Sequence, residues 1–199
     1  INRQNLQFTL AFYRGDIDVT LQELTALISV LRSVGYSVSA DSLSPVGKVE
    51  VLTTGLSYHS FDYFMEAEVM KLIGEPSAFP DMLSAYLTTG IYSPPMTYHI
   101  TLATSSASYP EPTNEIPLGL SPELDVLSTT YESIFDQFSR DSLNSIAIGM
   151  RYDFNAHFAI KGDISFLRGQ GQQRAFFEVK NADFNNSATL YQVALEWVF

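Results

Sequence analysis

Apolar residues alternate with polar or small residues along most of this chain, which is the pattern of β-strands with one apolar face. The clearest segment, residues 158–166, has Phe158, Ile160, Ile164 and Phe166 on one face and Lys161, Asp163 and Ser165 on the other. Eight segments alternate in this way, and we predict a strand over each of them: 6–13, 49–58, 62–72, 81–92, 96–107, 143–154, 157–167 and 188–199.

The connections between these strands alternate in length. Short turns are expected at residues 59–61, 93–95 and 155–156, and long connections at 14–48, 73–80, 108–142 and 168–187. In an antiparallel sheet of sequential strands, every short turn then lies at one end and every long loop at the other. This asymmetry is typical of transmembrane β-barrels of outer membranes. The fold class predicted is all-β, an antiparallel transmembrane β-barrel.

Alternation alone does not say which face of a barrel is outside, and in a soluble, lipocalin-like barrel the apolar face points inward. Composition favours lipid outside, because charged residues make up only 17% of the chain, against about 25% in soluble proteins. The polar face is rich in small and hydroxyl-bearing residues, which suit the wall of a water-filled lumen. No apolar run is long enough for a membrane helix, and the mean hydropathy is only +0.04.

Charge and missing residue types exclude several functions. The net charge of −11 argues against a nucleic-acid partner, because phosphate binding needs clustered Lys and Arg. The chain has no Cys and so no disulfide or thiolate metal site. His59, His99 and His157 lie in no known catalytic motif, so we expect neither an enzyme nor a cofactor. The exception considered is a barrel hydrolase in which His99 serves a site near the rim.

One segment has helical periodicity: Leu21, Leu24, Ile28 and Leu31. Thr20 with Glu23 makes a capping box, and Gly35 suits the C-terminal cap. We predict one helix from Thr20 to Val34, in an external loop. It either folds into the barrel mouth and narrows it or packs against neighbouring loops or the barrel rim. The second is favoured because an amphipathic helix requires only something to cover its apolar stripe.

The connection 108–142 is rich in proline and acidic residues, and we predict a solvated surface loop there. Binding of divalent cations that bridge lipopolysaccharide, or steering of cationic solutes toward the pore, are the alternatives for this loop.

The ionisable and polar residues on the predicted lumen face are the candidates for lining a pore: Glu66, Glu68, Tyr86, His99, Arg151, Lys161, Asp163 and Glu196. Opposed acidic and basic groups in a pore select solutes by charge and dipole. A charge in an aqueous lumen is also compatible with no role in selection.

The last eleven residues, 189–199, alternate to the end of the chain and stop on Phe199. This ending resembles that of bacterial outer-membrane β-barrels, whose final strand closes at a C-terminal Phe. The resemblance implies that the barrel assembly machinery reads Phe199 as an insertion signal.

Residues 148–154, Ile-Gly-Met-Arg-Tyr-Asp-Phe, are followed by a two-residue turn and by 158–163, Phe-Ala-Ile-Lys-Gly-Asp. This hairpin resembles a late hairpin of Gram-negative porin-like proteins, and residues 63–68, 85–90 and 96–98 look like earlier strands of such a barrel. The resemblance covers most of the chain from about Val49 onward. General porins carry a Pro-Glu-Phe-Gly-Gly motif in the loop that folds into the pore, and this sequence lacks it.

Porins are generally longer than 199 residues. The resemblance therefore implies that residues 1–199 form a single β-barrel domain that is incomplete at the N-terminus, the C-terminal half of a barrel of about 16 strands. A complete eight-stranded barrel is the alternative. Its interior would be filled by side chains, whereas Ser84, Ala103, Ala147 and Gly149 are too small to fill it.

The function expected is that of an outer-membrane porin of a Gram-negative bacterium, which passes small hydrophilic solutes by diffusion. Its partners would be the lipid bilayer and lipopolysaccharide, and a homotrimer is an option because porin relatives are often trimers. The alternative is a non-conducting barrel that acts as a scaffold or surface-binding protein through its long external loops.

Overall fold

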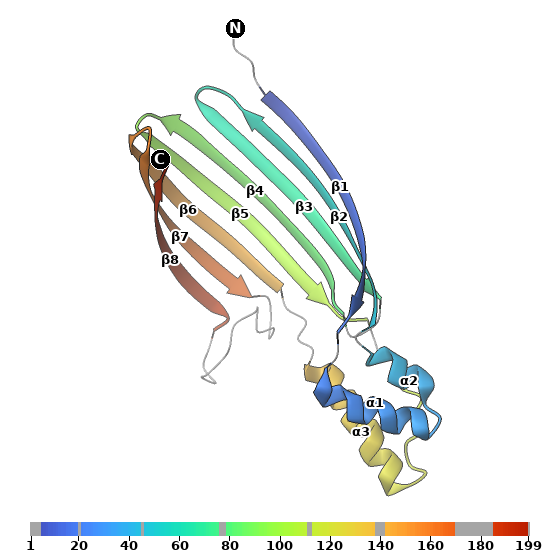
Figure 1. The fold of residues 1–199 in the computed structure, drawn as a ribbon. Helices are drawn as coiled ribbons and strands as arrows, with labels where there is room; N and C mark the ends of the chain where they lie inside the picture. Colours follow the sequence, from blue (N-terminus) through green and yellow to red (C-terminus); the bar gives the residue numbers. More distant parts are fainter. Residues whose placement is uncertain are drawn as a thin grey trace.

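The computed structural model describes residues 5–19, 21–44, 46–75, 79–110, 113–137, 142–169 and 185–198. Eight antiparallel strands form one curved sheet in the order of the chain (Figure 1). Their bounds are β1 (Asn5–Asp18), β2 (Val46–His59), β3 (Tyr63–Glu75), β4 (Asp81–Ser93), β5 (Met96–Ser108), β6 (Ser142–Asn155), β7 (Phe158–Gly169) and β8 (Ser187–Trp197). All eight predicted strands are confirmed, and β1 extends five residues beyond its predicted end at Tyr13.

The three predicted short turns and the long connections at 14–48, 108–142 and 168–187 are confirmed in their order, whereas the connection predicted at 73–80 is shortened to 76–80 because β3 runs to Glu75. Tight turns join β2 to β3, β4 to β5 and β6 to β7, and the connections that contain helices lie at the other end of the sheet (Figure 1). The last tight turn, residues 156–157, comes one residue later than predicted. The register shifts between Asp153 and Asn155 at this point, so that β6 runs one residue further than its alternation suggests.

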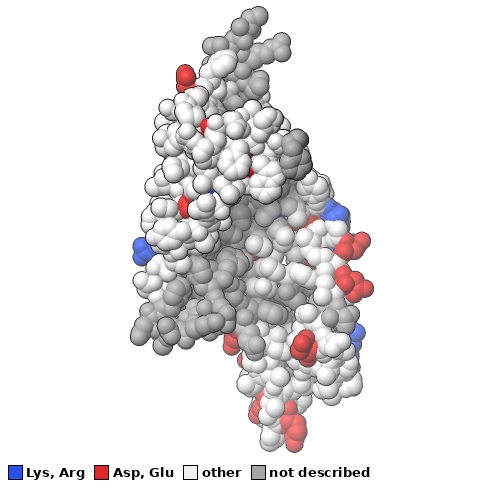
Figure 2. Space-filling model, turned by 60° about the vertical axis from the view of Figure 1, so that its left-hand side comes forward, with Lys and Arg blue, Asp and Glu red and all other residues white. Residues whose placement is uncertain are grey.

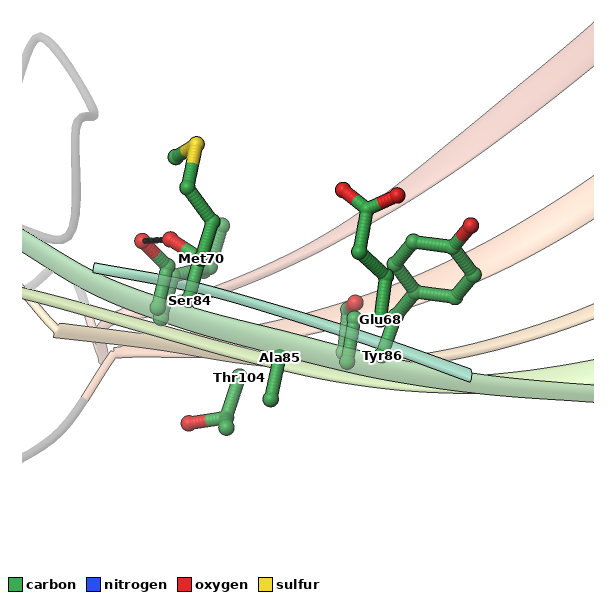
Figure 3. Close-up of a pocket in the computed structure, with 10 residues that line it drawn as sticks. Glu68, Met70, Ser84, Ala85, Tyr86 and Thr104 are labelled. Carbon is green, nitrogen blue, oxygen red and sulfur yellow. Dashed lines mark hydrogen bonds between the residues drawn. The ribbon is translucent and has the colours of Figure 1, made fainter. Parts of the chain in front are cut away.

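The strand register turns the sequence alternation into two chemically different faces. One row across all eight strands consists of Phe8, Leu56, Ala67, Leu87, Leu102, Ile146, Phe166 and Thr189. The adjacent row, on the opposite face, consists of Thr9, Gly55, Glu68, Tyr86, Ala103, Ser145, Leu167 and Ala188. We call the first the convex face and the second the concave face, because the sheet curves toward the side on which Glu68 and Tyr86 lie (Figure 3).

The convex face is mostly apolar, and no other described residues cover it. Its large side chains are exposed in every strand, for example Phe8 at 67%, Leu102 at 47% and Val193 at 76%. Concave-face residues of the central strands are mostly half-buried. The sheet therefore lacks the buried apolar interior of a soluble β-protein.

The two edges of the sheet are open. In the described residues, β1 pairs only with β2 and β8 only with β7, so the sheet does not close on itself. Phe199, the predicted assembly signal, lies outside the described residues.

The predicted helix is confirmed as α1 (Gln22–Ser33). Its N-cap residue is Leu21, without a side-chain capping bond, so the helix does not start at the predicted capping box, whose Thr20 lies outside the described residues. The predicted C-terminal cap is confirmed. Gly35 has φ +94°, and Tyr36 N–H donates to Leu31 O at 2.9 Å, as in a Schellman motif.

The prediction of a solvated loop over 108–142 is wrong for its second half, which forms α3 (Pro122–Gln137). A short helix, α2 (Ser37–Ser42), also follows α1. In the described part of the chain, no helix is long and apolar enough to cross a membrane.

The three helices form a helical subdomain with its own core. It is made by two connections, the one between β1 and β2 and the one between β5 and β6. Leu31 from α1, Ala40 from α2, and Ile116 and Tyr131 from the second connection are almost completely buried together. No Cα atom of these helices lies within 8 Å of a strand Cα in the described residues. The apolar stripe of α1 is thus covered by a neighbouring loop, as the favoured prediction for this helix states.

Hydrogen bonds link the two connections to each other. The Glu115 carboxylate accepts hydrogen bonds from the backbone N–H groups of Val38 and Ser39, at 2.8 and 3.2 Å. Ser42 and Tyr131 share a buried hydroxyl contact of 2.6 Å. Burial raises the pKa of the Tyr131 phenol, which stays protonated and donates to Thr113 O.

The change Leu31→Ala is expected to destabilise the helical subdomain by about 2–5 kcal/mol, because it leaves a cavity in a fully packed core. Hydrogen exchange should accelerate in 22–44 and 113–137 and stay unchanged in the strands. The control is Val30→Ala, since Val30 is 48% exposed on the same helix. Equal acceleration in the strands would contradict the separation of the two units.

Candidate functional site: the concave face of the sheet

All eight residues predicted to line a pore lie on strands β3 to β8 and point to the concave face. The register places them in neighbouring rows of this one face, and their role in lining a pore stays a prediction. The structure brings them together in three groups and leaves Glu68 beside Tyr86.

The largest group lies near the short-turn end of β6, β7 and β8. Arg151 on β6 reaches across β7 to Glu196 on β8, with Nη1 2.5 Å from Oε2. Its Nε also contacts Asp153 at 2.8 Å, and Lys161 pairs with the other oxygen of Glu196. Two cations and two carboxylates therefore form one neutral network.

A second group joins His99 on β5 to Asp163 on β7 over Gly149 on β6. The His99 Nε2 atom lies 3.0 Å from Asp163 Oδ1. A Cβ atom at position 149 would overlap with both side chains. The missing side chain of Gly149 is what allows two residues on non-adjacent strands to meet.

A third group lies at the short-turn end of β2, β3 and β4. His59 contacts Glu66 through Nε2 at 3.1 Å and the Tyr92 hydroxyl through Nδ1 at 3.2 Å. The His59 ring also stacks on Phe64, with ring centroids 5.8 Å apart.

Glu68 and Tyr86 stand side by side on β3 and β4, above a hollow of about 220 Å³. The rest of the concave-face lining combines the longer side chains of Met70 and Leu143 with short ones, including Ser84, Ala103 and Ser105. The hydroxyls of Ser84 and Ser105 are 2.8 Å apart. Figure 3 shows Glu68 and Tyr86 on the concave side, with Ala85 and Thr104 on the convex side. In the described part of the chain, Glu68 has no ion-pair or hydrogen-bond partner.

Sequence reasoning missed three members of these groups. His59 was expected in a turn but ends β2, and neither Tyr92 nor Asp153 was a candidate. Position gave a signal for Asp153, which follows Arg151 by two residues and so shares its face. The contact of His59 with Tyr92 depends on pairing across β3 and has no sequence signature.

The described residues contain no group of three His, Asp or Glu side chains that is able to hold a metal ion. No known protein family, characterised protein or solved structure matches this chain significantly.

Two glycines of the concave face should respond differently to alanine. Gly90→Ala places a Cβ 2.5 Å from the backbone oxygen of Tyr98, which cannot move without shifting β5. We expect a loss of about 1–3 kcal/mol in the free energy of unfolding. In Gly149→Ala the three atoms nearest to the added Cβ belong to the side-chain ends of His99 and Asp163, so this change should cost less, while separating that pair.

The measurement is thermal unfolding in detergent, with His99 ring resonances followed by NMR. The control is Gly162→Ala, where the nearest atom is 4.0 Å from the added Cβ. A larger loss at Gly149 than at Gly90, or an unchanged His99 resonance in Gly149→Ala, would rule out the close contacts described.

Proposed function

We propose that this chain is part of a transmembrane β-barrel of a Gram-negative outer membrane, and that the barrel works as a porin for small hydrophilic solutes. The observation that carries the proposal is the uncovered apolar convex face, opposite a concave face lined by polar and small residues. A bilayer covers the first and water fills the second.

Energetics favour a non-aqueous cover. Complete burial of a large apolar side chain contributes about 1.5–3 kcal/mol. The six large residues in the row from Phe8 to Phe166 are roughly half-exposed, so this one row alone represents about 5–9 kcal/mol. That is comparable with the whole stability of a typical domain, about 5–15 kcal/mol. The strands, 11 to 14 residues long, are long enough for the roughly 9–11 residues that a tilted crossing needs.

The short-turn end of the convex face has the aromatic side chains expected at a membrane interface. Aromatic side chains gather at the short-turn end, where the Tyr58 and Tyr63 rings lie 5.6 Å apart and the Phe154 and Phe158 rings 5.3 Å apart. The long-loop end instead carries charges, including the Arg14–Glu50 pair. Aromatic girdles at the interfaces are typical of such barrels.

The open edges favour a barrel larger than eight strands. Unpaired backbone N–H and C=O groups cost several kcal/mol each in hydrocarbon, so β1 and β8 need strand partners in a bilayer. Ser84, Ala103, Ala147 and Gly149 do not fill the interior that an eight-stranded barrel would have. A barrel of about 16 strands pairs both edges and leaves an aqueous lumen.

The helical subdomain supports a second candidate, an outer-membrane barrel that binds a partner through its external loops. Two long connections fold together there, and Leu118, Leu120 and Val126 are exposed at 63%, 74% and 67%. In that case the lumen is closed and the barrel is a scaffold.

The full-length protein in planar lipid bilayers is expected to give stable channels of uniform conductance. The reason is that polar and small residues line the concave face, which in the proposed barrel leaves an aqueous lumen. A control protein unfolded by heat before addition should give none. Correct insertion without any steady channel, together with binding of an envelope or surface ligand, would favour the scaffold.

A further inference from the structure

We propose that the channel selects cations, and that Glu68 is the carboxylate that attracts them. This inference deepens the proposed function and rests on it. It comes from the charge balance of the concave face, from the position of Glu68 and from the charge of the helical subdomain.

The concave face is acidic in net charge. On the described strands it carries five carboxylates, namely Glu66, Glu68, Asp153, Asp163 and Glu196. Arg151 and Lys161 are its two permanent cations. Five negative charges and two positive charges leave a balance of −3 with histidines neutral. An aqueous pore with such a wall concentrates cations and excludes anions.

Most of these charged side chains lie in ion pairs or contact a histidine, so the unpaired negative charge is concentrated at Glu68. Arg151 and Lys161 are both held by carboxylates, so neither faces the lumen as a free positive charge. Glu196 and Asp153 are neutralised by the same contacts, and Glu66 and Asp163 each have a histidine partner. Glu68 is the carboxylate of this face that has no such partner in the described residues.

The surroundings of Glu68 leave it open to a solute. Its neighbour on β2 is Gly55, which has no side chain, and its neighbour on β4 is Tyr86. The short side chains of Ala103 and Ser145 continue the same row across β5 and β6. The Glu68 carboxylate therefore projects from the concave face in the middle of its strand (Figure 3). In the proposed barrel this side faces the aqueous lumen, so an ion in transit meets this carboxylate.

The helical subdomain adds negative charge at the long-loop end. Its described residues include seven acids, Glu23, Asp41, Glu115, Glu123, Asp125, Glu132 and Asp136, against Arg32 as the single base. Arg32 is itself paired with Asp41 at 2.9 Å. Acidic side chains are visible on this end of the molecule, at the bottom of Figure 2. A field of this sign raises the local concentration of cations at the entrance.

The test is the reversal potential of the reconstituted full-length protein in a tenfold KCl gradient, at low salt because added salt screens the wall charges. We expect a potential that reports preference for K⁺ over Cl⁻. Glu68→Gln should lower the ratio of K⁺ to Cl⁻ permeability by about twofold or more, and Glu68→Lys should lower it further. The single-channel conductance should persist in both variants.

The matched control is Glu75→Gln, which removes the same charge from the same strand on the convex face. It should leave the reversal potential unchanged. A wild-type channel without cation preference, or equal shifts in Glu68→Gln and Glu75→Gln, would overturn this inference while leaving the porin intact. Absence of channels in every variant would overturn the porin and the inference together.

Discussion

The convex face of the sheet exposes apolar side chains along all eight strands, and the covering of that face is the constraint on which the rest of the structure depends. Hydrogen bonds between neighbouring strands hold the sheet, but they do not bury Leu87, Leu102 or Ile148. In water these side chains would drive aggregation. In a bilayer the same side chains are favourable, and the sheet needs no packed interior.

The chain contains two units that place their apolar side chains in opposite ways. The helical subdomain buries Leu31, Leu43 and Tyr131 completely and presents acidic side chains outward, as a water-soluble unit does. The sheet turns its apolar side chains outward and keeps its ion pairs on the concave face. The change from one arrangement to the other occurs at the long-loop end, where the convex face carries the Arg14–Glu50 ion pair. This position is where a membrane surface belongs in the proposed function.

The strands and their faces were predictable because alternation is a local property. Successive residues of a β-strand point to opposite faces, so odd and even positions in the sequence mark the two faces. Helix α3 was not predicted, although Pro122 suits its first turn and Leu124, Leu127, Tyr131 and Ile134 recur at helical spacing. The many proline and acidic residues of this connection led to the prediction of a loop in place of this helix. Contacts such as Arg151 with Glu196, or His99 with Asp163, skip a strand and depend on sheet curvature and on Gly149, which no local pattern encodes.

The most direct measurement of the central claim uses the absence of cysteine in the chain, which lets a single introduced cysteine carry a nitroxide label. Leu102→Cys and Ala103→Cys place labels on adjacent residues of β5, on the convex and the concave face. In lipid vesicles, electron paramagnetic resonance should show the label at 102 relaxed by oxygen, which partitions into lipid, and the label at 103 relaxed by a water-soluble nickel complex. A label at 102 that the nickel complex relaxes as strongly as the label at 103 would contradict the account.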